Sequence, residues 1–365
     1  MKSVKMTAVE IQKALEQEIV DGVYDRSKRL PSDNELCHRF GVARGTIRKA
    51  VDEIVRKGLA VRRRGSGSFL TTRGALHTKV IGLIIPEYSL STFFKYQVDA
   101  FVRVAKRFGY QVKLVETSEL KIGARTIDLR RKVRQLVADR VEGVVFRPLG
   151  AEDGFKCNLE LARILTNAKV PLVLLNRDFL SPPERSELDL ITVDNTMSGR
   201  VLARRFVRRK YQRVAFLFDN RHNNPNSNFD LRLFGIAGEL AVNGCTNAVR
   251  KLKFAPSDES AVKKLLKSAE RPSVIVCGND EIAAELVRTV TRIGMRVPED
   301  VAVTGFDDLP CARESVPPLT TIHQPLEAIA ETALRTLFAR IRNPGTAPRA
   351  VSLFADLVER RSTAK

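Results

Sequence analysis

Hydrophobic residues in the first seventy positions recur at helical spacing in three successive segments. They are Ile11, Leu15, Ile19 and Val20 in the first, Leu36 and Phe40 in the second, and Ile47, Val51 and Ile54 in the third. Residues three and four apart share one face of a helix, so each set predicts an amphipathic helix with a buried side. Apolar runs at residues 59–61 and 68–70 flank a glycine-containing turn and predict a β-hairpin.

The residues at the helix ends support these boundaries. Ser32 and Glu35 have the spacing of a capping box, in which each side chain accepts a hydrogen bond from the backbone of the other residue. Gly41 suits the left-handed position that ends a helix. Ala43 opens the third helix without a capping side chain, a loss that typically costs ~1 kcal/mol. Helix, turn, helix and hairpin together form a winged helix-turn-helix.

The pattern changes at residue 79, after a polar, glycine-containing linker at residues 71–78. Short β-rich runs then alternate with amphipathic helical stretches to the end of the chain. Strict alternation predicts parallel sheets with helices on both faces, and the length of this region suits two Rossmann-like subdomains better than one sheet. The predicted fold class is therefore α/β, with a winged helix-turn-helix at residues 1–70 and two parallel-sheet subdomains within residues 79–362.

The charge of the chain indicates a polyanionic partner. Its 62 Lys and Arg against 42 Asp and Glu give a net charge of +20, which favours nucleic acid. Residues 1–73 hold 16 basic and 9 acidic residues, about twice the net positive charge per residue of the remainder. On charge alone, a merely basic soluble protein is the alternative. For the first seventy residues the alternative is a small helical domain with a solvated basic face, but that does not explain why the charge concentrates on the third helix and the hairpin.

A winged helix-turn-helix places its second motif helix in the major groove of DNA and its hairpin near the backbone. On the helix, the candidate DNA contacts are Arg44, Thr46, Arg48 and Lys49. On the hairpin, they are Arg62, Arg64, Gly65, Ser66 and Gly67.

Composition argues against several other classes of protein. Five scattered cysteines without a CxxC pair, and four histidines without an HxxxH pair, indicate neither a disulfide framework nor a metal site. No apolar run approaches the ~20 residues of a membrane helix, and no secretory signal opens the chain, so we expect a cytoplasmic protein. Nucleotide-binding, hydrolase and zinc-protease motifs are absent, so we expect no cofactor and no enzymatic activity.

The carboxyl ends of the predicted strands carry the candidate ligand chemistry. Parallel-sheet folds bind ligands at these ends, and here the loops are rich in Asn, Asp and Arg with a few aromatic residues. Such groups suit a polyhydroxylated ligand, although strand ends also collect Asn, Asp and Gly for turns and caps. We expect Asp280 and Asp308 to be caps or turn residues, and the adjacent side chains of Asp307 and Asp308 to point apart.

The first seventy residues resemble the GntR family of bacterial regulators. The matching stretches are LPSDNEL at residues 30–36, GVARGTIRKA at 41–50 and GSGSF at 65–69. The resemblance implies that Arg44, Thr46 and Arg48 contact DNA and that Gly65 lies at the wing tip. Asn34 departs from the family, which usually has a basic residue at that position.

The larger region resembles the ligand-binding core of the LacI/GalR family, which is similar to periplasmic sugar-binding proteins. Matching stretches include residues 172–177, 193–195, 232–235, 278–280, 303–308, 318–325 and 357–362. The resemblance implies an effector cleft lined by Arg232, Asn279 and Asp307. It also implies that Asn176 takes a position often held by Asp, and that Phe93 or Phe94 would stack on a sugar ring. Arg147, at another strand end, suggests either an anionic sugar derivative or an ordinary surface ion pair.

The same resemblance implies three chain crossings between the subdomains. They are expected near Asp194, within residues 307–320, and after Ile341. The first subdomain would then comprise residues 79–193 and 321–341, and the second residues 194–320 and 342–362.

The two resemblances together predict a one-component transcriptional regulator, with the hybrid layout of arabinose-responsive repressors. We expect a homodimeric repressor that binds a near-palindromic double-stranded operator and responds to a small carbohydrate effector. The alternative is a binding module without operator specificity, either nucleoid-associated or sugar-sequestering.

Overall fold

The structure is a computed structural model, and it separates the chain into two compact units, residues 1–80 and 81–365. The residues that it describes are 6–20, 23–24, 29–63, 65–71, 78–86, 88–117, 122–150, 154–180, 183–211, 213–218, 228–245 and 249–364.

The first unit contains three helices and a hairpin, in the order that the hydrophobic pattern predicts. The helices are α1 (Ala8–Val20), α2 (Asp33–Phe40) and α3 (Arg44–Arg56), and the antiparallel strands are β1 (Ala60–Arg63) and β2 (Gly67–Leu70). Their apolar faces form one core in which Ile11, Leu36 and Ile54 are completely buried. We call this unit the head.

Local chemistry sets the boundaries of α2 as expected. The backbone N–H of Glu35 donates to Ser32 Oγ at 3.3 Å, and the N–H of Ser32 donates to Glu35 Oε2 at 2.6 Å. Gly41 ends the helix in the left-handed conformation, with φ of 64°. Ala43 precedes α3 without a side-chain cap. The capping box and the glycine stop are therefore confirmed.

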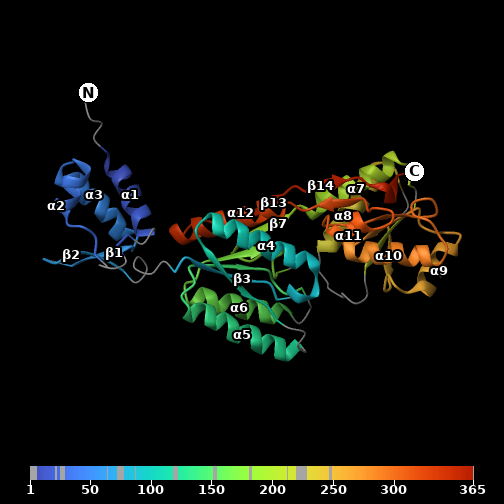
Figure 1. Cartoon of the computed structure of the whole chain (residues 1–365), viewed down its shortest axis with the longest axis horizontal. Coiled ribbons are helices and arrows are strands. Elements are labelled where there is room, and N and C mark those ends of the chain that lie inside the picture. The colour runs from blue at the N-terminus through green and yellow to red at the C-terminus, as the bar shows by residue number, and fades with distance from the viewer. Residues whose placement is uncertain are drawn as a thin grey trace, which may run out of the picture. The chain divides into compact units, whose positions relative to one another are not determined.

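Among the described residues, the second unit contains two large sheets, and each of them forms the centre of one subdomain. The first subdomain has six strands in the order β13-β7-β6-β5-β3-β4. Their bounds are β3 (Val80–Ile84), β4 (Gln111–Val115), β5 (Val144–Phe146), β6 (Leu172–Leu175), β7 (Asp189–Val193) and β13 (Ala350–Leu353). Helices α4 (Thr92–Arg107) and α12 (Leu326–Arg342) cover one face, and α5 (Ile122–Ala138) and α6 (Gly154–Asn167) cover the other (Figure 1).

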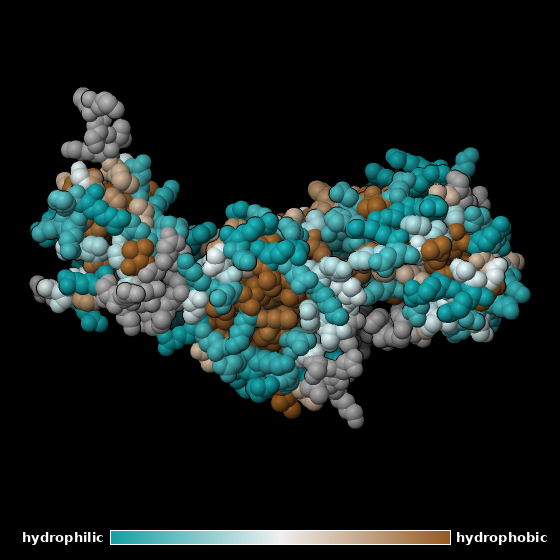
Figure 2. Space-filling view, viewed as in Figure 1, coloured by the Kyte–Doolittle hydropathy of each residue, from teal (hydrophilic) through white to brown (hydrophobic). Residues whose placement is uncertain are grey.

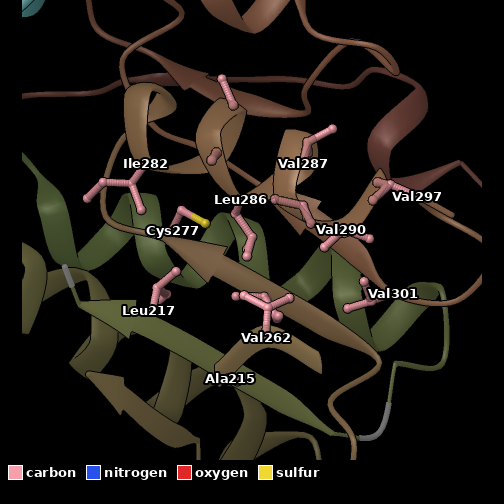
Figure 3. Packing of buried hydrophobic residues seen from close by; sticks show 14 of the residues in the cluster. Ala215, Leu217, Val262, Cys277, Ile282, Leu286, Val287, Val290, Val297 and Val301 are labelled. Atoms are coloured by element: carbon pink, nitrogen blue, oxygen red, sulfur yellow. The ribbon is translucent and has the colours of Figure 1, made fainter. Parts of the chain in front are cut away.

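The second subdomain has a four-stranded parallel sheet in the order β11-β10-β8-β9. Its strands are β8 (Val214–Phe218), β9 (Arg250–Lys253), β10 (Val274–Cys277) and β11 (Ala302–Thr304). Its helices are α7 (Asn195–Arg208), α8 (Asn228–Val242), α9 (Glu259–Lys267), α10 (Asp280–Arg292) and α11 (Pro310–Glu314). Figure 3 shows how Leu286 and Val290 of α10 point towards the sheet and Val262, where they form a buried core.

Two short strands lie where the chain passes between the subdomains, and the sequence pattern did not reveal them as a pair. They are β12 (Thr321–His323) and β14 (Asp356–Val358), which pair antiparallel. Residues 350–353 were expected in the second subdomain, but they form β13 and pair in parallel with β7 of the first. The expected assignment of this segment is therefore wrong. A four-residue strand carries no local signal of which sheet it joins, and pairing with β7 decides it.

One edge of the first subdomain exposes apolar surface. Strand β4 lies at the end of the six-stranded sheet, and its Val112 and Leu114 are only partly buried. Tyr96 and Val102 on the neighbouring α4 are 40% and 46% exposed. Figure 2 shows hydrophobic residues at the surface between α4 and α5, surrounded by hydrophilic ones. Such a patch is typical of a protein–protein contact.

Candidate DNA-binding face and effector site

Two arginines project from the first turns of α3. Arg44 and Arg48 are four residues apart, so they lie on the same face of the helix, and both are exposed. Their Nε atoms lie 3.8 and 3.5 Å from the Oδ2 atom of Asp33, the first residue of α2. Lys49 is exposed and Thr46 is partly buried. Asp33 therefore lies beside both guanidinium groups on one exposed face of the head.

The hairpin presents a second basic surface. Arg62 forms an ion pair with Asp52 of α3, with 2.8 Å between Nη1 and Oδ1. Gly65 and Gly67 have φ of 75° and 103°, which favour glycine, and Ser66 between them is exposed. A Cβ on Gly67 would lie 3.1 Å from the guanidinium of Arg29. Arg64 lies outside the described residues. The tip of the hairpin thus depends on glycine, and Arg62 is held against the helix.

Arg232 on α8 is the centre of a buried polar cluster in the second subdomain. Its Nε donates to Asn195 Oδ1 at 2.9 Å, and its Nη1 donates to the carbonyl of Gly278 at 2.5 Å. Its guanidinium carbon lies 3.3 Å from the centroid of the Phe306 ring. Burial lowers the pKa of Arg232 to about 10, so the side chain remains cationic at neutral pH.

Asp307 completes this cluster. It is buried, has a φ of 112°, and accepts a hydrogen bond from Gln324 Nε2 at 2.6 Å. Burial raises the pKa of this carboxyl well above its usual range, whereas the nearby charge of Arg232 acts to lower it. Asp308 faces other partners, His323 at 3.1 Å and Arg360 at 2.6 Å. The expectation that the two neighbouring carboxylates point apart is confirmed.

In the turn after β10, Asn279 and Asp280 have different hydrogen-bond partners from those that we expected. Asn279, predicted as an effector contact, caps α10 by accepting from the N–H of Ile282 at 2.9 Å. Asp280, expected as a cap, is fully buried and accepts from the N–H of Leu309 at 2.8 Å and from the hydroxyl of Thr321 at 2.6 Å. Burial raises its pKa to about 7. The cap expected at Asp280 is therefore wrong, because packing draws its carboxylate inward to the crossing strands.

The first subdomain brings together a different set of predicted residues. Arg147, only 5% exposed, lies over the ring of Phe94 with 4.1 Å between Cζ and the centroid. Phe93 is buried and meets Phe94 edge-on. Asn176 has a φ of 68° and accepts from Gln97 Nε2 at 3.1 Å. Arg147 is thus a buried cation against an aromatic ring and does not lie exposed at the surface.

Two hydrogen bonds join the two subdomains near the carboxyl ends of their strands. Glu281, in the first turn of α10, accepts from Ser91 Oγ and from the backbone N–H of Thr92, each at 3.1 Å. Ser91 caps α4, which follows β3, and α10 follows β10. Phe93 and Phe94 on one side and Asn279 on the other therefore lie beside this contact.

Comparison with known proteins matches one family model to the head and another to part of the second unit. Residues 7–70 match the model of bacterial regulatory proteins of the gntR family, and residues 203–363 match a periplasmic binding protein-like domain. A similar curated relative is the arabinose metabolism transcriptional repressor of Geobacillus stearothermophilus, 24% identical, with 94% of this chain and 92% of the relative covered. The PurR repressor of Vibrio atlanticus is 28% identical, with 87% and 89% covered.

Solved structures agree on the fold. A complex of the transcriptional regulator CelR with cellobiose has a TM-score of 0.64 at 23% identity, with 91% of this chain and 100% of that chain covered. The lac repressor dimer bound to operator and an anti-inducer has a TM-score of 0.63 at 23% identity, with 78% and 93% covered. The chain is a transcriptional regulator whose head matches the gntR family model and whose sensor matches the periplasmic binding protein-like domain.

Sequence reasoning missed several side chains that shape the sensor of this regulator. Asn195 and Phe306 stood in strand-end loops and in stretches that resemble the LacI/GalR family, but neither was named as a site residue. Phe229 lies inside α8 with its ring 5.2 Å from the Arg232 guanidinium, and Gln97 lies inside α4. Residues within helices carry no strand-end signal, so only the packing of the helices could identify them.

The relatives are regulators and not enzymes. Within the described part of the chain, no three His, Cys, Asp or Glu side chains gather in a way that could hold a metal ion. Among the same residues, no helix combines the length and apolar character needed to cross a bilayer.

Proposed function

We propose that this regulator is a cytoplasmic repressor whose head binds a near-palindromic operator and whose sensor binds a small carbohydrate effector. Residues 1–70 would form the DNA-binding domain, 71–78 the linker and 79–362 the sensor. A homodimer would supply two heads to two half-sites, because operator symmetry reflects protein symmetry. We assign no catalytic step to the sensor and no cofactor to the chain.

The buried pair of Arg232 and Asp307 carries the effector part of this proposal. A guanidinium on α8 and a carboxyl group just after β11 offer planar donors and acceptors to neighbouring hydroxyl groups. Phe306 and Asn195 hold the guanidinium in place, so little ordering of the side chain remains when a ligand binds. Arg147 on Phe94 adds a cation to the opposite wall, which favours sugar acids or sugar phosphates among the candidates.

The mechanism that we propose is linkage between the two units. An effector that binds one arrangement of the subdomains more tightly would shift the sensor towards it, and the spacing of two heads in a dimer would change. Reciprocity requires operator DNA to change effector affinity by the same factor, with a typical coupling of ~1–3 kcal/mol.

A thermal-shift screen against sugars, sugar acids and sugar phosphates tests the effector class. A ligand at 100 times its Kd stabilises the folded protein by about 2.7 kcal/mol. Arg232→Ala should abolish the shift, whereas Arg292→Ala, an exposed arginine paired with Glu259, should keep it. A full panel without a stabilising ligand, in a protein that still binds its operator, would refute carbohydrate sensing.

Operator selection from random DNA tests the DNA-binding part. We expect a selected near-palindrome that the protein binds at least ~10³-fold more tightly than random DNA, the lower end for specific regulators. Equal affinity for selected and random DNA would refute the repressor assignment and leave a binding module without operator specificity. Contacts to DNA phosphates dominate both operator-specific and non-specific binding, so the salt dependence of affinity alone does not distinguish a repressor from a non-specific binding module.

A further inference from the structure

The contact between Glu281 and the start of α4 joins the two sensor subdomains across 190 residues of sequence. One carboxylate oxygen accepts from the Ser91 hydroxyl, and the other accepts from the Thr92 backbone N–H, each at 3.1 Å. A carboxylate at a helix N-terminus binds free N–H groups and interacts favourably with the helix dipole. Glu281 thus serves as a second cap of α4, supplied by the other subdomain.

Both ends of this contact are held in place by their own subdomain. Ser91 Oγ also accepts from the N–H of Phe93 at 3.2 Å, so it is the N-cap of α4. On the other side, Asn279 caps α10, and the neighbouring Asp280 is bonded to Leu309 and Thr321 near the crossing strands. The turn that carries Glu281 therefore moves with the second subdomain, and the contact exists only when that subdomain approaches α4.

We propose that Glu281 is a positioning residue that clasps the two subdomains together and thereby sets how tightly the sensor binds its effector. The consequence for affinity rests on the proposed effector site. The clasp stabilises the arrangement in which Phe93 and Phe94 lie opposite the α10 turn. An effector that binds this arrangement has an apparent affinity scaled by the fraction of molecules that already adopt it.

Hydrogen–deuterium exchange of the ligand-free, full-length protein measures the clasp directly. The backbone N–H of Thr92 donates to the Glu281 carboxylate, so Glu281→Ala should accelerate its exchange by about tenfold, the lower end for a hydrogen bond to a charged group. Glu299→Ala removes an exposed glutamate of the same subdomain and should leave the exchange of Thr92 unchanged.

Ser91→Asp separates the clasp from the folding of α4. Aspartate is as good an N-cap as serine, so the helix keeps its cap, but the new carboxylate faces that of Glu281 and repels it. We expect Ser91→Asp to accelerate Thr92 exchange as much as Glu281→Ala does. Adding Glu281→Gln to Ser91→Asp should restore protection, because an amide N–H can donate to the new carboxylate.

Unchanged exchange of the Thr92 N–H in both Glu281→Ala and Ser91→Asp would overturn the proposed clasp. Exchange in the Ser91→Asp, Glu281→Gln double variant that is as fast as in Ser91→Asp alone would also overturn it. These outcomes do not depend on an effector. A regulator whose clasp behaves as predicted but which no small molecule stabilises would overturn the proposed effector site and leave the clasp intact.

Discussion

Helices α7 and α8 cross at two glycines, and this crossing positions Arg232. A Cβ on Gly199 would lie 2.1 Å from the carbonyl oxygen of Arg232, and a Cβ on Gly235 would lie 2.0 Å from that of Thr196. Both neighbours are backbone atoms, which cannot rotate away. Gly199→Ala must therefore push the helices apart by about 1 Å to reach a tolerable contact.

The cost of this displacement follows from two opposing effects. Overpacking typically costs ~1–3 kcal/mol, and alanine returns up to ~1 kcal/mol through its higher helix propensity. We expect a net loss of about 1–2 kcal/mol of unfolding free energy. Asn195 is on α7 and Arg232 on α8, so the same movement would lengthen their 2.9 Å hydrogen bond beyond useful range. A hydrogen bond to a charged group contributes ~1.5–3 kcal/mol, so effector affinity should fall about tenfold or more.

Gly238→Ala is the matched control for this prediction. Gly238 is exposed on α8, the helix that carries Arg232. A Cβ on Gly238 would meet nothing within 4 Å, so the substitution should stabilise the protein slightly. Thermal unfolding and effector titration measure both variants, with operator binding as a check on the head. Equal stability of the two variants, with unchanged effector affinity in Gly199→Ala, would refute the reasoning.

Three further predictions concern the head and the buried carboxyl. Arg48→Ala should weaken operator binding and lower its salt dependence, whereas Arg56→Ala, an exposed arginine later in α3 that pairs with Glu53, should change little in the same gel-shift titration. Asp33→Asn removes the carboxylate beside Arg44 and Arg48, and it should raise the affinity of the protein for random DNA. An unchanged ratio of operator affinity to random-DNA affinity would argue against a role of Asp33 in positioning the two arginines. Burial in the folded protein raises the pKa of Asp280 from 3.8 to about 7. Between these two values, Asp280 is protonated in the folded protein and loses its proton on unfolding. This group therefore makes the free energy of unfolding fall as pH rises from about 4 to 7. Thermal unfolding across this range should show a smaller fall in Asp280→Asn; parallel curves for the two proteins would contradict the assignment.

Local signals in the sequence determined the elements of the head and the alternating pattern of the sensor. Ser32, Glu35 and Gly41 specify a helix boundary within a span of ten residues, because caps act on backbone groups of the nearest turn. Hydrophobic period alone placed α3 and predicted the parallel sheets. The resemblance of residues 232–235 and 303–308 to the LacI/GalR family identified Arg232 and Asp307 as candidates.

Only the tertiary structure decided which of these side chains meet. Strand β13 could join either sheet, and its pairing with β7 settled the matter. Asn279 and Asp280 are neighbours of similar size, yet Asp280 is buried against Thr321 and Asn279 caps α10. The partners of Arg232 and Glu281 lie 37 to 190 residues away. Contacts over such separations depend on how helices pack and where the chain crosses, and no short stretch of sequence encodes that information.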